Sequence, residues 1–266
     1  MINASVVIYK HSPEDIQSVL QSLKSSPVVH DIFIIDNSPV RNNVFDDGRC
    51  VYIFNGKNPG FGAAHNIALR KTIEAGLPYH LVINPDIHFK SEILEKIVNY
   101  ADNHADTGHI MPLVLNPDGT IQYLCKLIPT PSDLIFRRFL QGNISKKRME
   151  KFEMRNTGYD KIMEVPYLSG CFMFFRTDAL IQAGLFDERF FMYPEDIDLT
   201  RRIHRHYKTI FFPEVSVIHE HTRSSYKNFR MFLIHLSNLV RYFNKWGWLF
   251  DKERKLINQK IINQKI

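Results

Sequence analysis

Three carboxylates, Glu195, Asp196 and Asp198, occur within four positions of an acidic motif that follows the aromatic segment 190–193. A carboxylate that emerges from apolar surroundings is partly desolvated, which raises its proton affinity and suits a general base acting on a hydroxyl group. Acids in the first turn of a helix also interact favourably with the helix dipole, so capping alone is the alternative. Both interpretations place the motif at the start of a helix.

Asn84-Pro85-Asp86 follows an apolar run, so the Asp86 carboxylate is predicted to emerge at the end of a buried strand. Mg²⁺ or Mn²⁺ keeps several waters and is often completed by phosphate oxygens, so one or two protein carboxylates are enough to hold it. His219 closes a later strand and could complete the metal shell with Asp86. The alternatives are a β-turn at residues 84–86 and a structural histidine.

Two glycine-containing segments are candidates for close approach by a ligand. Gly60-Phe61-Gly62, with Asn58 and Asn66 around it, precedes a predicted helix whose N-terminus suits an anion, although neither GxGxxG nor GxxxxGK[ST] is present. Ser169-Gly170 interrupts an apolar strand and marks either a site where a ligand crowds the backbone or an ordinary strand irregularity.

The elements that position these residues alternate between apolar strands and amphipathic helices in the first half of the chain. Strands are expected at 4–9, 31–36, 51–54 and 79–84, and helices at 12–25, 62–75 and 91–104. This order predicts a Rossmann-like, doubly wound sheet, whose ligands bind beyond the carboxyl ends of the strands. Asp36-Asn37 and Asn84-Pro85-Asp86 lie at such ends.

The second half is less regular and predicts a mixed sheet built onto the first. Strands are expected at 109–115, 166–176, 209–212 and 216–219, with helices at 177–183 and 196–206. No internal repeat or low-complexity linker divides the chain, so one domain is expected over residues 1–224, followed by a C-terminal segment over residues 225–266.

The C-terminal segment carries the formal charge of the protein. From Phe229 to Ile266 it holds eight Lys or Arg residues against two acids, which matches the net charge of +6 for the whole chain. A second basic cluster spans residues 137–155. Apolar residues recur at helical spacing from Phe229, with Trp246 and Trp248 behind them. An amphipathic helix of this kind can lie on a membrane surface or pack on the domain.

Length and composition exclude several classes. The 266 residues, 44% hydrophobic and 23% charged, describe an ordinary globular protein rather than a disordered chain. No apolar run is long enough to span a bilayer, no signal peptide is evident, and three cysteines without a CxxC pair favour a reducing compartment. We expect a cytoplasmic protein.

As a set, these motifs resemble glycosyltransferase family 2, and within it the bacterial rhamnosyltransferases of O-antigen and cell-wall assembly. The resemblance runs from the first strand to about Ser224 and implies a GT-A fold, a sugar-nucleotide donor, a divalent cation (Mg²⁺ or Mn²⁺) and inversion of the anomeric centre. It implies donor nucleotide contacts at the strand ends and in the glycine-containing turn: Asp36, Asn37, Asn58, Gly60, Phe61, Gly62, Asn66, Asn84 and Asp86.

The resemblance also implies that Asp196 is the catalytic base, with Glu195 beside it near the donor sugar and acceptor. Ser169 and Gly170 would lie beside the donor sugar, and Asp86 and His219 would hold the metal. Asn84 stands where many relatives carry a first Asp, which lowers the expected metal affinity. The implied donor is dTDP-L-rhamnose and the implied acceptor is a polyprenyl-diphosphate-linked or polysaccharide glycan, with the C-terminal segment on the inner face of the cell membrane.

Three other functions compete with this interpretation. A dehydrogenase or nucleotidyltransferase of Rossmann type needs a glycine fingerprint after the first strand, where Tyr9-Lys10-His11-Ser12 supplies none. A family 2 transferase could use a UDP- or GDP-hexose instead, and a non-catalytic sugar-nucleotide-binding subunit would share the same motifs. Nucleic-acid binding is disfavoured because the body to Asn228 is formally neutral and carries no recognition motif.

Overall fold

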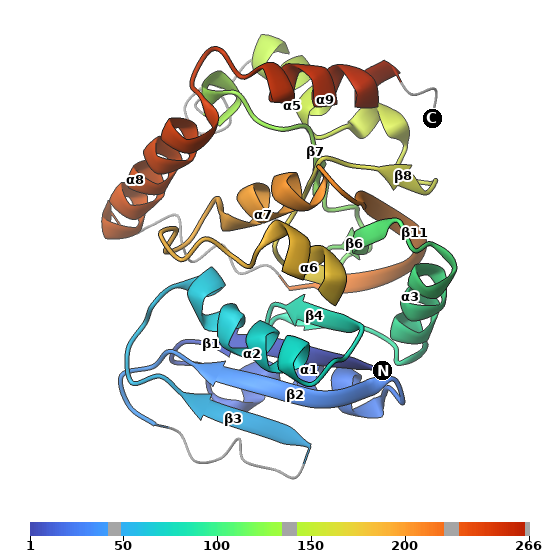
Figure 1. Cartoon of the computed structure of the whole chain (residues 1–266), viewed down its shortest axis with the longest axis vertical. Coiled ribbons are helices and arrows are strands. Elements are labelled where there is room, and N and C mark those ends of the chain that lie inside the picture. Colours follow the sequence, from blue (N-terminus) through green and yellow to red (C-terminus); the bar gives the residue numbers. More distant parts are fainter. Residues whose placement is uncertain (42–48, 135–142, 221–228, 264–266) are drawn as a thin grey trace.

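A computed structural model describes residues 1–41, 49–134, 143–220 and 229–263. Within these residues the chain forms a mixed sheet flanked by helices (Figure 1). The strands are β1 (Ile2–Ile8), β2 (Val29–Asp36), β3 (Cys50–Phe54), β4 (Tyr79–Ile83), β5 (Ile87–His88), β6 (Thr107–Leu115), β7 (Cys125–Lys126), β8 (Met163–Glu164), β9 (Tyr167–Leu168), β10 (Phe172–Arg176) and β11 (Lys208–His219). The helices are α1 (Pro13–Ser25), α2 (Phe61–Glu74), α3 (Glu92–Asn103), α5 (Asn143–Phe152), η2 (Arg155–Thr157), α6 (Thr177–Ala183), α7 (Glu195–Ile203), α8 (Phe229–Trp246) and α9 (Lys252–Asn263).

The strand order β3-β2-β1-β4-β10-β6-β11-β5 confirms the mixed α/β sheet. The first four strands are parallel and are linked by crossovers, as the alternating strand and helix pattern predicted. β10 is antiparallel to both β4 and β6, whereas β11 runs parallel to β6. The carboxyl ends of β1, β2 and β4 therefore meet at one edge, where ligands of such sheets bind.

Helices cover both faces of the sheet because its central strands are apolar on both sides. In β2, Ile32 and Ile34 belong to the apolar cluster that includes the inner face of α1. Their neighbours Phe33 and Ile35 point the other way and belong to the cluster that includes α2. This alternation is what a period of two along a strand buried on both faces produces.

The strand expected over 166–176 is divided into two. β9 pairs with β7 in a small separate sheet, and β10 joins the main sheet. Residues 169–171 form the turn between them, so Ser169 and Gly170 lie where the chain leaves one sheet for the other. The strands expected at 209–212 and 216–219 are one strand, β11, with an irregular register between Phe212 and Ser216.

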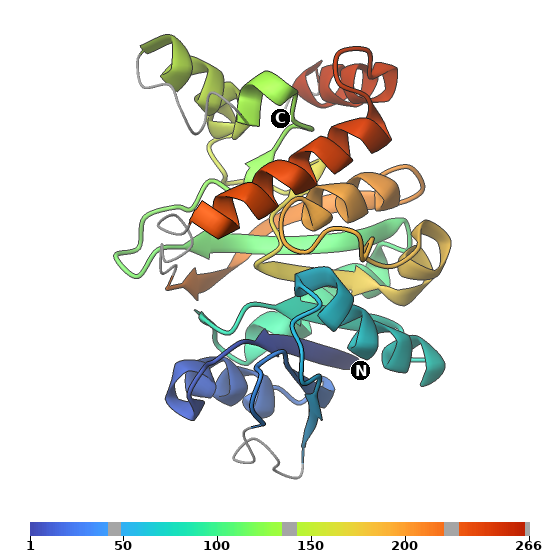
Figure 2. The same ribbon diagram turned by 90° about the vertical axis from the view of Figure 1, so that its left-hand side faces the viewer.

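The C-terminal segment folds as two helices that pack on the domain. Tyr242 and Phe243 of α8 are 1% and 2% exposed, and α8 lies beside α7 (Figure 2). In α9, Asn258 exchanges two hydrogen bonds with the backbone of Ile128, both at 2.9 Å. The inner faces of both helices therefore pack on the domain, which is one of the two alternatives that the sequence left open. The expected boundary at residues 224 and 225 lies outside the described residues.

No helix within the described part of the chain combines the length and apolar character needed to cross a bilayer.

Candidate active site

Asp86 and His219 meet at the edge of the sheet. Asp86 follows β4, and His219 ends β11, to which the chain returns after more than 130 residues. The backbone N–H of Glu220 donates to the Asp86 carbonyl at 2.9 Å, and Asp86 Oδ1 lies 3.3 Å from His219 Nε2. The structure thus brings together the two residues that the sequence proposed as a metal pair.

Gln122, which the sequence did not single out, orients His219. The Gln122 amide nitrogen donates to the His219 carbonyl oxygen and to Asn116 Oδ1, both at 2.9 Å. Its Oε1 therefore faces His219 Nδ1, at 2.9 Å, and accepts that ring proton. The lone pair of a neutral His219 ring is then on Nε2, the atom that faces Asp86.

These donor atoms fit a divalent cation. A carboxylate oxygen and an imidazole nitrogen, with the second ring nitrogen held by an amide, form a common arrangement in metal sites. Among residues 1–41, 49–134, 143–220 and 229–263, no group of three or more His, Cys, Asp or Glu side chains gathers around a point. The chain would supply two ligands here, which leaves the other positions to water and phosphate oxygens.

Asp196 lies in the first turn of α7 and is held by three hydrogen-bond donors. Its Oδ2 accepts from the backbone N–H of Gly170 at 3.1 Å and from the Tyr167 hydroxyl at 3.3 Å. Its Oδ1 accepts from the N–H of Ile197 at 2.8 Å. Burial raises the pKa of Asp196, and the nearby Lys126 charge and these donors oppose that rise.

Glu195 lies beside Asp196 and is 5% exposed. Within the described residues, its Oε2 atom has no hydrogen-bond partner. Burial, and then the Asp196 charge, raise the pKa of Glu195 well above its ordinary value. Burial therefore favours the protonated form of Glu195 more strongly than that of Asp196.

Cys171 links the metal pair to the acidic motif. Its carbonyl accepts a hydrogen bond from the N–H of Asn84 at 2.9 Å, which ties the turn before β10 to the end of β4. Burial raises the pKa of its thiol to about 12, and the charges of Asp86 and Asp196 add to that rise. Two carboxylates from distant parts of the sequence therefore act on one buried group.

Asp36 and Asn37 lie at the end of β2, which is separated from β4 by β1. Asp36 is 1% exposed and accepts from the Tyr52 hydroxyl at 2.6 Å and the Ser38 N–H at 2.8 Å. The Asn37 side chain accepts from the Asn55 amide at 2.7 Å. These bonds hold both side chains at the carboxyl edge of the sheet, where a nucleoside contact was predicted.

The turn at 58–62 is closed by the loop that leads to α7. Gly60 has a φ of 102°, and a Cβ there would collide with the backbone of Phe191. The Phe61 N–H donates to the Phe191 carbonyl at 2.9 Å, and a Cβ at Gly62 would lie 2.7 Å from Phe186 Cβ. These glycines allow a close approach of the chain to itself, so contact with a nucleotide stays a prediction.

Asn58 and Asn66 hold that turn and that loop. Asn58 Oδ1 accepts from the Gly60 N–H at 3.0 Å and faces the Asn37 amide at 3.3 Å. The Asn66 amide donates to the Phe186 carbonyl at 2.9 Å and accepts from its N–H at 3.0 Å. Asn66 is 1% exposed. Its hydrogen bonds to Phe186 hold the loop before α7, so Asn66 supports the site through that loop.

Lys126 and Tyr167 are further residues of the site that the sequence analysis missed. Lys126 is only 3% exposed, and its ammonium lies 4.9 Å from the centre of the Tyr167 ring. Both belong to strands of two residues, which are too short for a period to reveal. Nothing else in the local sequence distinguished Lys126 from a surface lysine.

No family model matches the chain. It is 28% identical over 185 residues to the N-acetylglucosaminyl-diphospho-decaprenol L-rhamnosyltransferase of Mycobacterium tuberculosis. This match covers 64% of this chain and 58% of that protein. The chain thus spans a little over half the length of this relative. It is 27% identical over 250 residues to the rhamnosyltransferase WbbL of Escherichia coli K12, covering 89% and 91% of the two chains.

The fold is similar to that of solved glycosyltransferases. The crystal structure of GalNAc-T7 with UDP, GalNAc and Mn²⁺ superposes with a TM-score of 0.66 at 14% identity, over 92% of this chain and 48% of that one. The GT-A fold expected from the motifs is confirmed.

Proposed function

We propose that this chain, a rhamnosyltransferase-like protein with the GT-A fold, is an inverting glycosyltransferase that moves a sugar from a sugar nucleotide to a hydroxyl group of a glycan acceptor. The observation that carries the proposal is that the turn at residues 169–171 contacts both parts of the site. The Gly170 N–H donates to Asp196 Oδ2 at 3.1 Å, and the Cys171 carbonyl accepts from the N–H of Asn84, two residues before Asp86, at 2.9 Å. A cation-binding pair beside a desolvated base is the arrangement that displacement of a diphosphate by a hydroxyl requires.

The first part of the reaction concerns the leaving group. Asp86 and His219 would hold a divalent cation, which when bound neutralises the charge that grows on the leaving diphosphate. Asp36 and Asn37 would contact the nucleoside, because they lie at the same carboxyl edge of the sheet.

The second part concerns the acceptor proton. Asp196, held by Tyr167 and the Gly170 N–H, would take the proton of the attacking hydroxyl. Ser169-Gly170 would border the donor sugar, since the turn they form lies directly against Asp196. Glu195, which favours its protonated form, would donate a hydrogen bond to a sugar hydroxyl. Attack from the face opposite the diphosphate inverts the anomeric carbon.

The relatives support L-rhamnose as the sugar and a lipid-linked glycan as the acceptor. Two of them are named as rhamnosyltransferases, and one is named for a diphospho-decaprenol acceptor. We therefore propose dTDP-L-rhamnose as the donor and a polyprenyl-diphosphate-linked sugar as the acceptor, in the synthesis of a bacterial surface glycan.

The test is transfer by the full chain to a short-chain N-acetylglucosaminyl-diphospho-polyprenol. dTDP-L-rhamnose and UDP- and GDP-hexoses are compared, each with Mn²⁺, Mg²⁺ or EDTA. The proposal predicts a rhamnosylated product that depends on a divalent cation. Transfer from a hexose donor alone would contradict the rhamnose assignment, and neither transfer nor hydrolysis of any donor would contradict the enzyme and favour a non-catalytic assembly subunit.

We also propose that the outer surface of the C-terminal helices contacts the membrane that presents such an acceptor. Phe250 and Leu249, between α8 and α9, are 94% and 78% exposed. Leu233, Leu236 and Val240 form an exposed apolar stripe on α8 at helical spacing. The exposed lysines of α9 add attraction to anionic lipids: Lys252, Lys255 and Lys260.

Flotation with phosphatidylglycerol vesicles tests this surface. Leu249→Asp combined with Phe250→Asp should abolish flotation, because two apolar side chains are replaced by charges that anionic lipid repels. Ile181→Asp, which changes an apolar residue of α6 that is 61% exposed, is the matched control and should still float. Equal flotation of the double variant and the control would contradict the proposal.

A further inference from the structure

Lys126 is a buried cation beside the acidic motif. It is 3% exposed and lies in β7, which pairs with β9 in the small sheet against α7. Lysine is almost never buried to this degree without a charge or a polar group to compensate it. The burial of Lys126 therefore indicates a role that a surface lysine does not have.

A short series of contacts leads from Lys126 to Asp196. In the register of the small sheet Lys126 stands opposite Tyr167, and its ammonium lies 4.9 Å from the centre of that ring. The Tyr167 hydroxyl donates to Asp196 Oδ2 at 3.3 Å. The lysine is thus connected to the Asp196 carboxylate through the tyrosine.

The charged and titratable groups that face Asp196 come from several elements. Glu195 is its neighbour in α7, Cys171 lies in the turn before β10, and Tyr167 and Lys126 belong to β9 and β7. Of these groups, only Lys126 carries a positive charge. The Lys126 charge lowers the pKa of Asp196 and of the Cys171 thiol, whereas the pKa rise of Glu195 is opposed by backbone hydrogen bonds.

We propose that Lys126 is a positioning residue that decides which acid of the Glu195–Asp196 pair loses its proton, keeping Asp196 as the carboxylate. Two adjacent buried carboxyl groups resist double ionisation, so the first proton leaves the acid with the more favourable surroundings. Lys126 supplies that asymmetry. The inference rests on the proposed function, because only a base needs to be ionised while its neighbour remains protonated.

The test is a ¹³C NMR titration of the full chain with carboxyl-labelled aspartate or glutamate, in which Asp196→Asn and Glu195→Gln assign the two signals. In the unaltered protein, Asp196 should ionise at lower pH than Glu195. Lys126→Met should raise the pH at which Asp196 ionises by about one unit or more, as expected when an opposite charge within reach is removed. Lys126→Arg is the matched control that keeps the charge.

Either of two results would overturn the proposal. One is ionisation of Glu195 before Asp196 in the unaltered protein, a reading that needs no variant to fold. The other is an Asp196 signal that titrates at the same pH in the Met and Arg variants. The titration requires no substrate, so absence of sugar transfer would count against the proposed function alone.

Discussion

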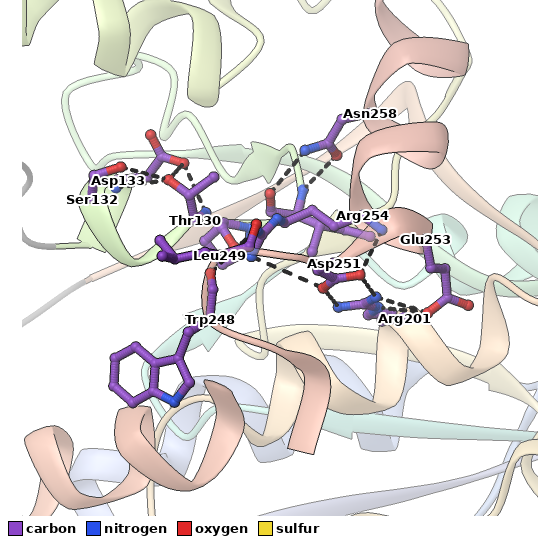
Figure 3. Close-up of polar contacts among 12 residues, drawn as sticks. Thr130, Ser132, Asp133, Arg201, Trp248, Leu249, Asp251, Glu253, Arg254 and Asn258 are labelled. Carbon is purple, nitrogen blue, oxygen red and sulfur yellow. Dashed lines mark hydrogen bonds and ion pairs between the residues drawn. The ribbon is translucent and has the colours of Figure 1, made fainter. Parts of the chain in front are cut away.

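The two ends of α7 accommodate buried charge in opposite ways. At its start, Glu195 and Asp196 place two acids side by side, and both have raised pKa values. Towards its end, Arg201 is 1% exposed and is paired on both sides (Figure 3). Its two terminal nitrogens each lie 2.7 Å from an oxygen of Asp251, and one also lies 2.7 Å from Glu253.

The two ends also differ in their response to pH. Burial pushes the pKa of Asp251 upward, but hydrogen bonds from Arg201 and the Arg254 N–H outweigh it and hold that pKa below its ordinary value of 3.8. The stability that Asp251 contributes is therefore present above about pH 4 and is lost as the pH falls further. Burial raises the pKa of Glu195 above 4.5, so its ionisation costs stability as the pH rises above that value.

The Arg201 cluster therefore has the features of a structural ion pair, whereas the Glu195–Asp196 pair has the features of a binding or catalytic site. The Arg201–Asp251 pair is compensated within the chain and fastens the start of α9 to the helix that carries the proposed base. Burial disfavours ionisation of the acidic pair, and a protein tolerates such a cost where the chemistry needs it. Substitutions at the two ends should therefore separate activity from stability.

The largest effect is expected for Asp196→Asn. Loss of the base should lower the transfer rate by about 100- to 10,000-fold, because general-base catalysis contributes that range. Stability at pH 7 should not fall, because the change removes a buried carboxyl whose pKa is raised. Steady-state transfer and thermal unfolding of the same samples check both statements, and a variant with normal turnover would exclude Asp196 as the base.

Asp251→Asn should do the reverse. Breaking a buried ion pair from one side costs about 3 to 5 kcal/mol, because it leaves Arg201 with less compensation. At about 2 to 4 °C per kcal/mol, Tm at pH 7 should fall by roughly 6 to 20 °C, with a smaller difference below pH 4. Turnover at 20 °C should stay within a few-fold of normal. Glu253→Gln, at a more exposed partner, is the milder comparison, and an equal Tm for both variants would contradict a dominant Asp251 pair.

Gln122→Leu tests the proposed metal pair without changing Asp86 or His219. Residues that orient a metal-bound histidine typically change metal affinity by about 10- to 100-fold when replaced. The concentration of Mn²⁺ needed for half-maximal transfer should rise by that factor. Calorimetric Mn²⁺ binding in the presence of the nucleoside diphosphate checks the same change without turnover, and unchanged affinity would show that Gln122 does not orient His219.

The smallest effect is expected for Glu195→Gln. Below about pH 4.5 the variant and the unaltered protein should have similar stability, and above that pH the variant should gain on the order of 1 kcal/mol. Denaturant unfolding at pH 4 and pH 7 measures the difference. The opposite result is a variant that loses stability relative to the unaltered protein between pH 4 and pH 7. That result would show that the two ends of α7 do not differ in their response to pH.

The sequence predicted the sheet and most of its helices because their signals are local. The buried strand before Asp86 and the helix that begins at Glu195 could be identified from apolar periodicity and capping. The β7–β9 sheet could not, because each strand has two residues and its pairing joins positions more than 40 apart. The positions of Lys126 and Gln122 are set by contacts between distant parts of the sequence. The residues that orient the predicted site were therefore not predicted with it.

The C-terminal segment shows a different limit. Its helical spacing and its charge were evident, but one pattern fits both a membrane surface and a protein surface. The sequence around Arg201 gives no indication that its partners are Asp251 and Glu253, some 50 residues later.

Asp36 and Asp86, 50 positions apart in the sequence, are proposed to serve one sugar-nucleotide site. Thermal unfolding with dTDP-, UDP- and GDP-sugars, with and without Mn²⁺, tests this claim most directly. A cognate donor at about 100 times its dissociation constant should stabilise the protein by about 2.7 kcal/mol, and Asp36→Asn and Asp86→Asn should each weaken that stabilisation. If no sugar nucleotide shifts the transition, or if both variants respond as the unaltered protein does, the claim is wrong.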